Sequence, residues 1–187
     1  MGDSDTSQRA GRVPRSDGPV FDVTLSKLRR PRSQAGTVLR PSLIERLTQD
    51  DSRPIVSVVA PAGYGKTTLL SQWAARGGPA FAWVSVDERD NDPKLLLTYV
   101  AEALDRVAPV SRRVFDALTS PGSSVPGAVV PRLGSAFASM TVPVVLVLDD
   151  VHLLSNRESR AALSVLADHV PDGSRLVLAG RAEPSGT

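Results

Sequence analysis

Residues 55–68 read IVSVVAPAGYGKTT, and this stretch decides the fold. The β-branched run at 55–59 is typical of a parallel strand that is buried on both faces. The segment after it matches the P-loop pattern G-x-x-x-x-G-K-[ST] at every fixed position except the first, where Ala60 replaces glycine. A helical pattern follows at once, which is the context that a P-loop requires. The stretch therefore predicts a phosphate-binding turn between a strand and a helix.

The residue types of this turn suit a polyphosphate. Gly63 and Gly65 permit the tight turn that points backbone N–H groups at a phosphate with no side chain in the way. Lys66 brings a cation to the β- and γ-phosphates at the start of a helix, whose dipole also favours an anion. The Thr67 hydroxyl is suited to ligate Mg²⁺. Ala60 is a mild defect, because a positive φ there would cost about 1 kcal/mol.

The predicted nucleotide contacts span the whole turn, with an ordinary glycine-rich strand–helix turn as the alternative. They are Ala60, Pro61, Ala62, Gly63, Tyr64, Gly65, Lys66, Thr67 and Thr68.

A second apolar run, at 143–148, ends in the acidic pair Asp149 and Asp150. Parallel strands deliver such side chains to the carboxyl edge of the sheet, where α/β proteins bind ligands. We expect Asp149 to hold Mg²⁺ through water as a Walker B acid. Asp150 is the candidate to orient or deprotonate an attacking water. A helix cap or a solvated turn is the alternative, but the position about 80 residues after the P-loop favours function.

Arg181 directly follows a further apolar run at 175–180. In the sheet order of many ATPases this strand lies between the P-loop strand and the Walker B strand. Arg181 would then face the γ-phosphate and act as a sensor of its presence. The alternative is a solvated arginine at the end of a strand.

Strand patterns alternate with helical patterns along the chain, which indicates βαβ units and a parallel sheet covered on both faces. We predict an α/β fold, a P-loop NTPase of the ASCE type with three layers. The chain ends a few residues after the fourth strand, so we expect the domain to be truncated at its C-terminus. Residues 1–23 are predicted to be a disordered tail and residues 24–187 the NTPase domain. The expected strands are 55–59, 81–86, 143–148 and 175–180, and the expected helices are 41–47, 66–76, one from Asp92-Pro93, two pieces within 111–140, and one after a capping box Ser155–Glu158.

Composition excludes several classes of protein. The 187 residues include no cysteine and only two histidines, which excludes a disulfide scaffold, a thiol nucleophile and a Cys-ligated metal centre. The net charge of +2 gives no global field for nucleic acid. Neither a membrane-spanning run nor a secretory signal is present in the sequence, so a cytoplasmic location is expected.

Four other groups of residues are weaker candidates, and for each we favour the structural interpretation. The basic strip from Lys27 to Arg40 is either a solvated lead-in or a strip that lies along a nucleotide or an acidic partner. The acidic residues after the second strand lack calcium-loop spacing and indicate a solvated turn. The histidines are expected to be packing or surface residues and the tryptophans core residues. The last three groups are Asp87, Glu88, Asp90 and Asp92; His152 and His169; and Trp73 and Trp83.

Taken together, these blocks resemble the N-terminal NTPase module of the LuxR-family, MalT-like STAND regulators. The resemblance implies an ATP/ADP-toggled switch, in which nucleotide and an inducer permit self-association and DNA binding. It also implies that Val38 and Arg40 lie near the adenine. DNA would be bound by a C-terminal helix-turn-helix part that this chain lacks. The matching blocks are 26–31 (SKLRRP), 38–43 (VLRPSL), 58–73, 82–87 (AWVSVD), 90–93 (DNDP), 145–154 and 176–181 (LVLAGR).

The favoured function is an ATP-binding regulatory module that hydrolyses ATP slowly. One alternative is a free-standing P-loop enzyme such as a small-molecule kinase, which would need acceptor-binding residues and a basic lid after the fourth strand. The other is a non-functional fragment of a regulator.

Overall fold

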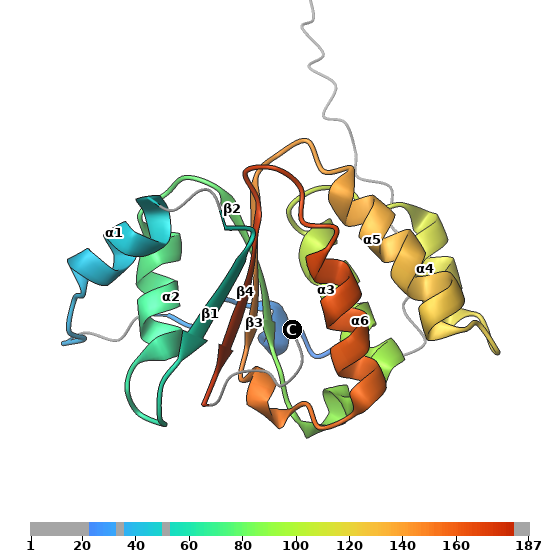
Figure 1. Cartoon of the computed structure of the whole chain (residues 1–187), viewed down its shortest axis with the longest axis horizontal. Helices are drawn as coiled ribbons and strands as arrows, with labels where there is room; N and C mark the ends of the chain where they lie inside the picture. The colour runs from blue at the N-terminus through green and yellow to red at the C-terminus, as the bar shows by residue number, and fades with distance from the viewer. Residues whose placement is uncertain (1–22, 33–35, 50–52, 182–187) are drawn as a thin grey trace, which may run out of the picture.

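A four-stranded parallel sheet forms the centre of the molecule (Figure 1). The structure, a computed structural model, describes residues 23–32, 36–49 and 53–181. The strand order is β1-β4-β3-β2, so β4 lies between the P-loop strand and the strand that carries the acidic pair, as expected. The α/β prediction is therefore confirmed. The strands are β1 (Ile55–Val59), β2 (Ala80–Ser85), β3 (Val144–Asp149) and β4 (Arg175–Gly180).

Helices cover the sheet on two sides and make three layers (Figure 1). On one side lie α1 (Pro41–Gln49) and α2 (Lys66–Ala75). On the other side α3 (Pro93–Asp105) and α6 (Arg157–Ala167) pack on the sheet, with α4 (Arg112–Thr119) and α5 (Val130–Ala138) against them. The remaining turns are η1 (Leu25–Leu28), η2 (Glu88–Asn91), the π-helical η3 (Val125–Val129) and η4 (Val151–Leu153). No helix in the described ranges is both long and apolar enough to cross a membrane.

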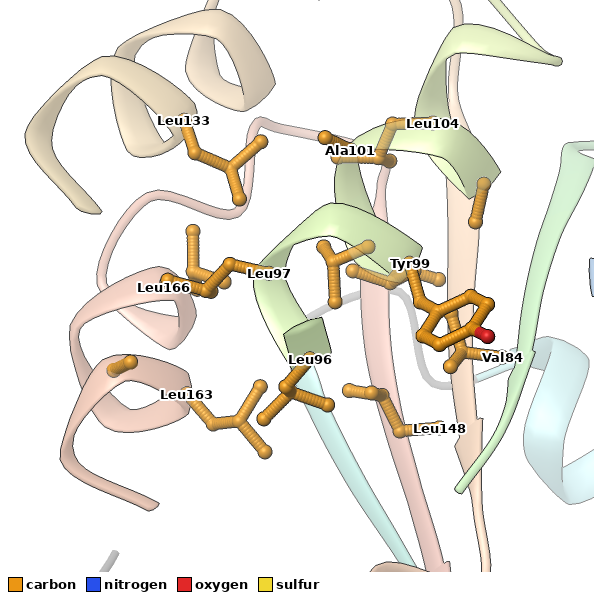
Figure 2. Packing of buried hydrophobic residues seen from close by; sticks show 14 of the residues in the cluster. Val84, Leu96, Leu97, Tyr99, Ala101, Leu104, Leu133, Leu148, Leu163 and Leu166 are labelled. Atoms are coloured by element: carbon orange, nitrogen blue, oxygen red, sulfur yellow. The ribbon is translucent and has the colours of Figure 1, made fainter. Parts of the chain in front are cut away.

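Each face of the sheet has its own apolar core. The larger core joins β2, β3 and β4 to α3 and α6, and Figure 2 shows Leu96 and Leu97 of α3 beside Leu163 and Leu166 of α6. The smaller core lies under α1 and α2, and it contains Trp73 and Trp83 at 3% and 2% exposed. The prediction that both tryptophans are core residues is confirmed. Complete burial of a leucine or phenylalanine side chain stabilises a fold by about 1.5–3 kcal/mol, so two buried tryptophans are a substantial part of this smaller core.

Strand β1 differs from the prediction of a strand buried on both faces. Val56 and Val58 pack against the smaller core, but Ile55 and Val59 are 39% and 41% exposed. The reason is position: β1 is the end strand of the described sheet, and the larger core reaches only β2, β3 and β4.

The helix starts are mostly as predicted. Asp92 caps α3 by accepting hydrogen bonds from the N–H groups of Lys94 (2.8 Å) and Leu95 (3.1 Å). The region 111–140 forms two helices, α4 and α5, as expected. The predicted capping box at 155–158 placed the helix N-cap at Ser155, which is wrong by one residue. In the structure Asn156 is the N-cap of α6. Part of the predicted tail, residues 1–22, lies outside the described residues, so that interpretation stays a prediction.

Candidate functional site

The P-loop forms the turn between β1 and α2 that its glycines predict. Gly63 and Gly65 both have φ of +79°, in the left-handed region that favours glycine. Lys66 begins α2, and its Nζ donates hydrogen bonds to the carbonyl oxygens of Ala60 (2.7 Å) and Pro61 (3.2 Å). Ala60 is not strained, since the non-glycine residue with positive φ among the described residues is Asp150. The lysine thus lies over its own loop, within reach of a phosphate bound there.

The acidic pair lies at the carboxyl end of β3, against the P-loop helix. Thr67 Oγ1 donates a 2.6 Å hydrogen bond to Asp149 Oδ2, across 82 positions of sequence. The Asp149 side chain is buried, and its Oδ1 accepts from the N–H of Asp150 at 3.1 Å. Burial raises the pKa of Asp149, and the charge of Asp150 adds to this, although the Thr67 hydrogen bond opposes it.

A magnesium ion fits this pair of oxygens. Mg²⁺ in nucleotide sites is held by one or two protein oxygens together with phosphates and waters. Thr67 and Asp149 supply a hydroxyl and a carboxylate in direct contact. Burial makes the ionised form of Asp149 unfavourable and so raises its pKa. A cation bound here would stabilise the ionised carboxylate. Within the described ranges no three His, Asp or Glu side chains gather into a metal cluster.

Asp150 adopts an unusual backbone conformation. Its φ of 62° and ψ of 33° are left-handed, which costs a non-glycine residue about 1–3 kcal/mol and persists only where the surroundings hold it. Its side chain is 47% exposed, so water can reach the carboxylate. His152 lies close by, with Nδ1 3.8 Å from Asp150 Oδ1. His152 is mostly buried and His169 packs against Gly134 of α5, which agrees with the prediction that both are packing or surface residues.

Arg181 follows β4 at the same edge of the sheet. In the β1–β4 pairing Val59 is opposite Gly180, and the N–H of Ala60 donates to the Gly180 carbonyl at 3.3 Å. Arg181 thus follows the residue that pairs with the start of the P-loop, and its side chain is exposed.

The segment that contains Val38 and Arg40 lies beside the P-loop helix. The Val38 carbonyl accepts a hydrogen bond from Gln72 Nε2 at 3.1 Å. Gln72 is six residues beyond Lys66, which is about 9 Å along a helix. Val38 is 73% exposed and Arg40 is also exposed, so neither side chain is committed to the core.

The acidic loop after β2 is only in part the solvated turn that we expected, because Glu88 and Asp92 are exposed but Asp90 is not. Asp90 is fully buried, and the Nζ of Lys27 lies 2.6 Å and 2.5 Å from its two carboxylate oxygens. Lys27 is itself only 7% exposed, which corrects its assignment to a solvated strip. Burial raises the pKa of Asp90, while Lys27 opposes the shift. The one available signal was that both residues fall within blocks of the family resemblance.

A surface groove of about 740 Å³ lies elsewhere, and it is lined mainly by residues of α4 and α5 and the loops next to them. None of the predicted site residues lines it.

A parallel sheet, a P-loop and an acidic strand end in contact with it are now established, and the sequence comparison agrees. Residues 41–178 match the family described as AAA ATPase domain. The chain belongs to the AAA ATPase domain family. This domain is 33% identical over 168 residues to the HTH-type transcriptional regulator MalT of Klebsiella pneumoniae subsp. pneumoniae. It is 34% identical over 172 residues to MalT of Serratia proteamaculans.

Each alignment covers 85% of this chain and 18% of the relative, so the AAA ATPase domain spans about a fifth of the length of those regulators. The resemblance to MalT-like regulators is confirmed. Among solved structures, the domain is similar to the Walker-type ATPase PABY2304 of Pyrococcus abyssi. That match has 12% identity and a TM-score of 0.48, and it covers 81% of this chain and 48% of the other.

Proposed function

We propose that this AAA ATPase domain binds ATP and ADP with Mg²⁺ and hydrolyses ATP slowly, as the nucleotide switch of a MalT-like transcriptional regulator. The contact between Thr67 and Asp149 carries the proposal, because it joins the P-loop to the acidic edge of the sheet. The P-loop amides and Lys66 would bind the phosphates, and Val38 and Arg40 would lie along the adenine side of α2.

The acidic edge supplies the chemistry. Thr67 and Asp149 would hold Mg²⁺, which when bound offsets the charge of the phosphates. Asp150, with a solvent-accessible carboxylate, would orient or deprotonate the attacking water. Lys66 now bonds to the carbonyls of Ala60 and Pro61. When nucleotide binds, Lys66 would bond to phosphate instead, so the contacts within the loop would depend on nucleotide.

The switch depends on a difference between the ATP and ADP states. A ligand shifts a conformational equilibrium only by its differential affinity for the two states. Arg181, beside the start of the P-loop, is the residue that we propose to contact the γ-phosphate and thereby favour one state. Self-association in the ATP state, and DNA binding through a helix-turn-helix part outside this chain, belong to the same proposal. Its support is that the relatives are named HTH-type transcriptional regulators.

Calorimetry and phosphate release test the proposal on the full 187-residue chain. We expect ATP and ADP to bind in the presence of Mg²⁺, with slow release of phosphate from ATP. Asp150→Asn should bind ATP as the wild type does and hydrolyse it about 100-fold or more slowly, because a general base contributes about 10²–10⁴-fold. Asp172→Asn, an exposed residue in the turn before β4, is the matched control and should change neither quantity. A folded chain without nucleotide binding would refute the function, and unchanged hydrolysis in Asp150→Asn would remove Asp150 from its role.

A further inference from the structure

The Asn91 side chain connects the loop after β2 to the segment that follows the acidic pair. Its Oδ1 accepts hydrogen bonds from the N–H groups of Ser155 and Asn156, both at 2.7 Å, and from Ser155 Oγ at 3.2 Å. Its Nδ2 donates to the carbonyls of Leu153 and Glu88, both at 3.0 Å. Both ends of one carboxamide are therefore used, mostly on residues more than 60 positions away.

The segment held by Asn91 closes the turn that begins at Asp150. The N–H of Leu153 donates to the Asp150 carbonyl at 3.0 Å, which makes η4 a single tight turn. Asp150 is thus held by β3 before it and by η4 after it. Its left-handed conformation needs such support from its surroundings. Asn91 fixes the far end of that support.

The loop that carries Asn91 is itself anchored in the core. Asp90 accepts from Lys27 Nζ through both oxygens and from the N–H of Asp87 at 2.7 Å. The Lys27 ammonium also lies 4.2 Å from the ring centroid of Tyr99 on α3. Ser159 of α6 donates to the backbone carbonyls of Asp90 (3.4 Å) and Asn91 (3.2 Å). Anchored by Lys27 of η1 and Ser159 of α6, the loop can hold Asn91 in one place.

We propose that Asn91 is a positioning residue for ATP hydrolysis, which holds η4 so that the Asp150 carboxylate keeps its orientation, with the Lys27–Asp90 ion pair fixing Asn91. This inference rests on the proposed function, since it assigns Asn91 a task only if Asp150 acts on water. The Asn91 side chain bonds to Glu88, Leu153, Ser155 and Asn156, so the role proposed for it is to position and not to act on the substrate.

Two variants of Asn91 and one neighbouring control test the role. Asn91→Ala removes all of its hydrogen bonds to the η4–α6 segment, and we expect kcat to fall about tenfold with the Kd for ATP changed less than about twofold, as small misplacements of catalytic groups do. Asn91→Asp keeps the acceptor for Ser155 and Asn156 and should recover part of kcat. Asp92→Ala also removes two accepted backbone hydrogen bonds, but these belong to α3. Asp92→Ala should lower Tm about as much as Asn91→Ala does, but it should leave kcat unchanged.

A readout that does not need turnover separates this inference from the proposed function. By amide hydrogen exchange, Leu153, Ser155 and Asn156 should lose protection in Asn91→Ala and keep it in Asp92→Ala, and the ¹⁵N shift of Asp150 should move only in the first variant. Wild-type chain that binds ATP without hydrolysing it would refute the hydrolysis, and the Asp150 shift would then decide whether Asn91 positions that residue. Wild-type kcat in Asn91→Ala, or an equal loss in Asp92→Ala, would overturn the role. If Asn91→Ala does not fold, kcat, amide protection and the Asp150 shift are compared between Asn91→Asp and Asp92→Ala instead.

Discussion

Thr67 Oγ1 lies 2.6 Å from Asp149 Oδ2, although 82 positions separate the two residues. This contact links the first turn of α2 to the end of β3, and it brings together the two protein oxygens suited to Mg²⁺. It is also the contact on which the proposed nucleotide function depends most directly, so it is the first to test.

Thr67→Val removes the hydroxyl and keeps the shape of the side chain. We expect the Mg²⁺-dependent part of ATP affinity to fall at least tenfold, because a hydrogen bond or ligand bond to a charged group contributes about 1.5–3 kcal/mol. Binding in EDTA should stay within about twofold on the same reasoning. Isothermal titration calorimetry with and without Mg²⁺ measures both. Thr119→Val, which removes a hydroxyl bonded only to backbone carbonyls of α4, is the control. If Mg²⁺ raises the ATP affinity of Thr67→Val as much as that of the wild type, the proposed magnesium site is contradicted.

Lys66→Ala should abolish measurable ATP binding while the chain stays folded. The side chain bonds only to loop carbonyls in the structure, but in the complex it would neutralise phosphate charge through charge-assisted hydrogen bonds. A loss of about 100-fold or more is the expected order. Lys94→Ala is the matched control, since Lys94 also donates to a backbone carbonyl, that of Ser120. Equal affinity in wild type and Lys66→Ala, measured by calorimetry, would refute the phosphate site.

The raised pKa of Asp149 predicts a pH dependence of stability with a definite sign. Burial lifts the pKa above its ordinary 3.8, so between that value and the raised pKa the folded state binds more protons than the unfolded state. Asp149 therefore stabilises the chain less as pH rises through this window. Without nucleotide, the free energy of unfolding of wild type relative to Asp149→Asn should fall as pH rises above about 4 and level off once pH exceeds the raised pKa.

Urea unfolding of both proteins across this range measures that difference. With Mg²⁺ and ATP present the sign should reverse, because the metal binds the ionised carboxylate and its contribution grows with pH. The stabilisation by Mg²⁺ and ATP should increase with pH in wild type more than in Asp149→Asn. A difference in stability that is independent of pH in both conditions would contradict the buried carboxylate.

Gly134→Ala tests the packing of α5 against His169, in the turn that follows α6. A Cβ at this position would lie 2.9 Å from Cγ and Cδ2 of the His169 ring. We expect a loss of about 1–3 kcal/mol from overpacking, reduced by the roughly 1 kcal/mol that alanine adds to a helix. In a His169→Ala background the same change should be neutral or stabilising. Urea unfolding of the wild type, the two single variants and the double variant measures these free energies. If Gly134→Ala changes stability equally in the wild-type and the His169→Ala backgrounds, the clash is excluded.

Most of the fold could be predicted because local patterns encode it. The four strands, the glycine turn and the Asp92 cap each depend on a few neighbouring residues whose periodicity or backbone preference is visible in sequence. The exposure of Ile55 and Val59 could not be predicted, because the same β-branched run suits a strand with one or two covered faces. The error at Ser155 has a similar cause. Its backbone N–H and hydroxyl both donate to Asn91, a partner that no local window contains.

The sequence by itself determined the phosphate turn, the acidic strand end and the order of strands and helices along the chain, since these follow from short-range backbone chemistry and hydrophobic spacing. Tertiary structure alone decided that Lys27 and Asp90 form a buried pair and that Asn91 supports the turn after Asp150. Those contacts join residues more than 60 positions apart. From sequence alone, a single lysine, aspartate or asparagine is predicted to be solvated. Only the folded structure shows that it is buried, and a buried polar group then needs a partner from another part of the chain.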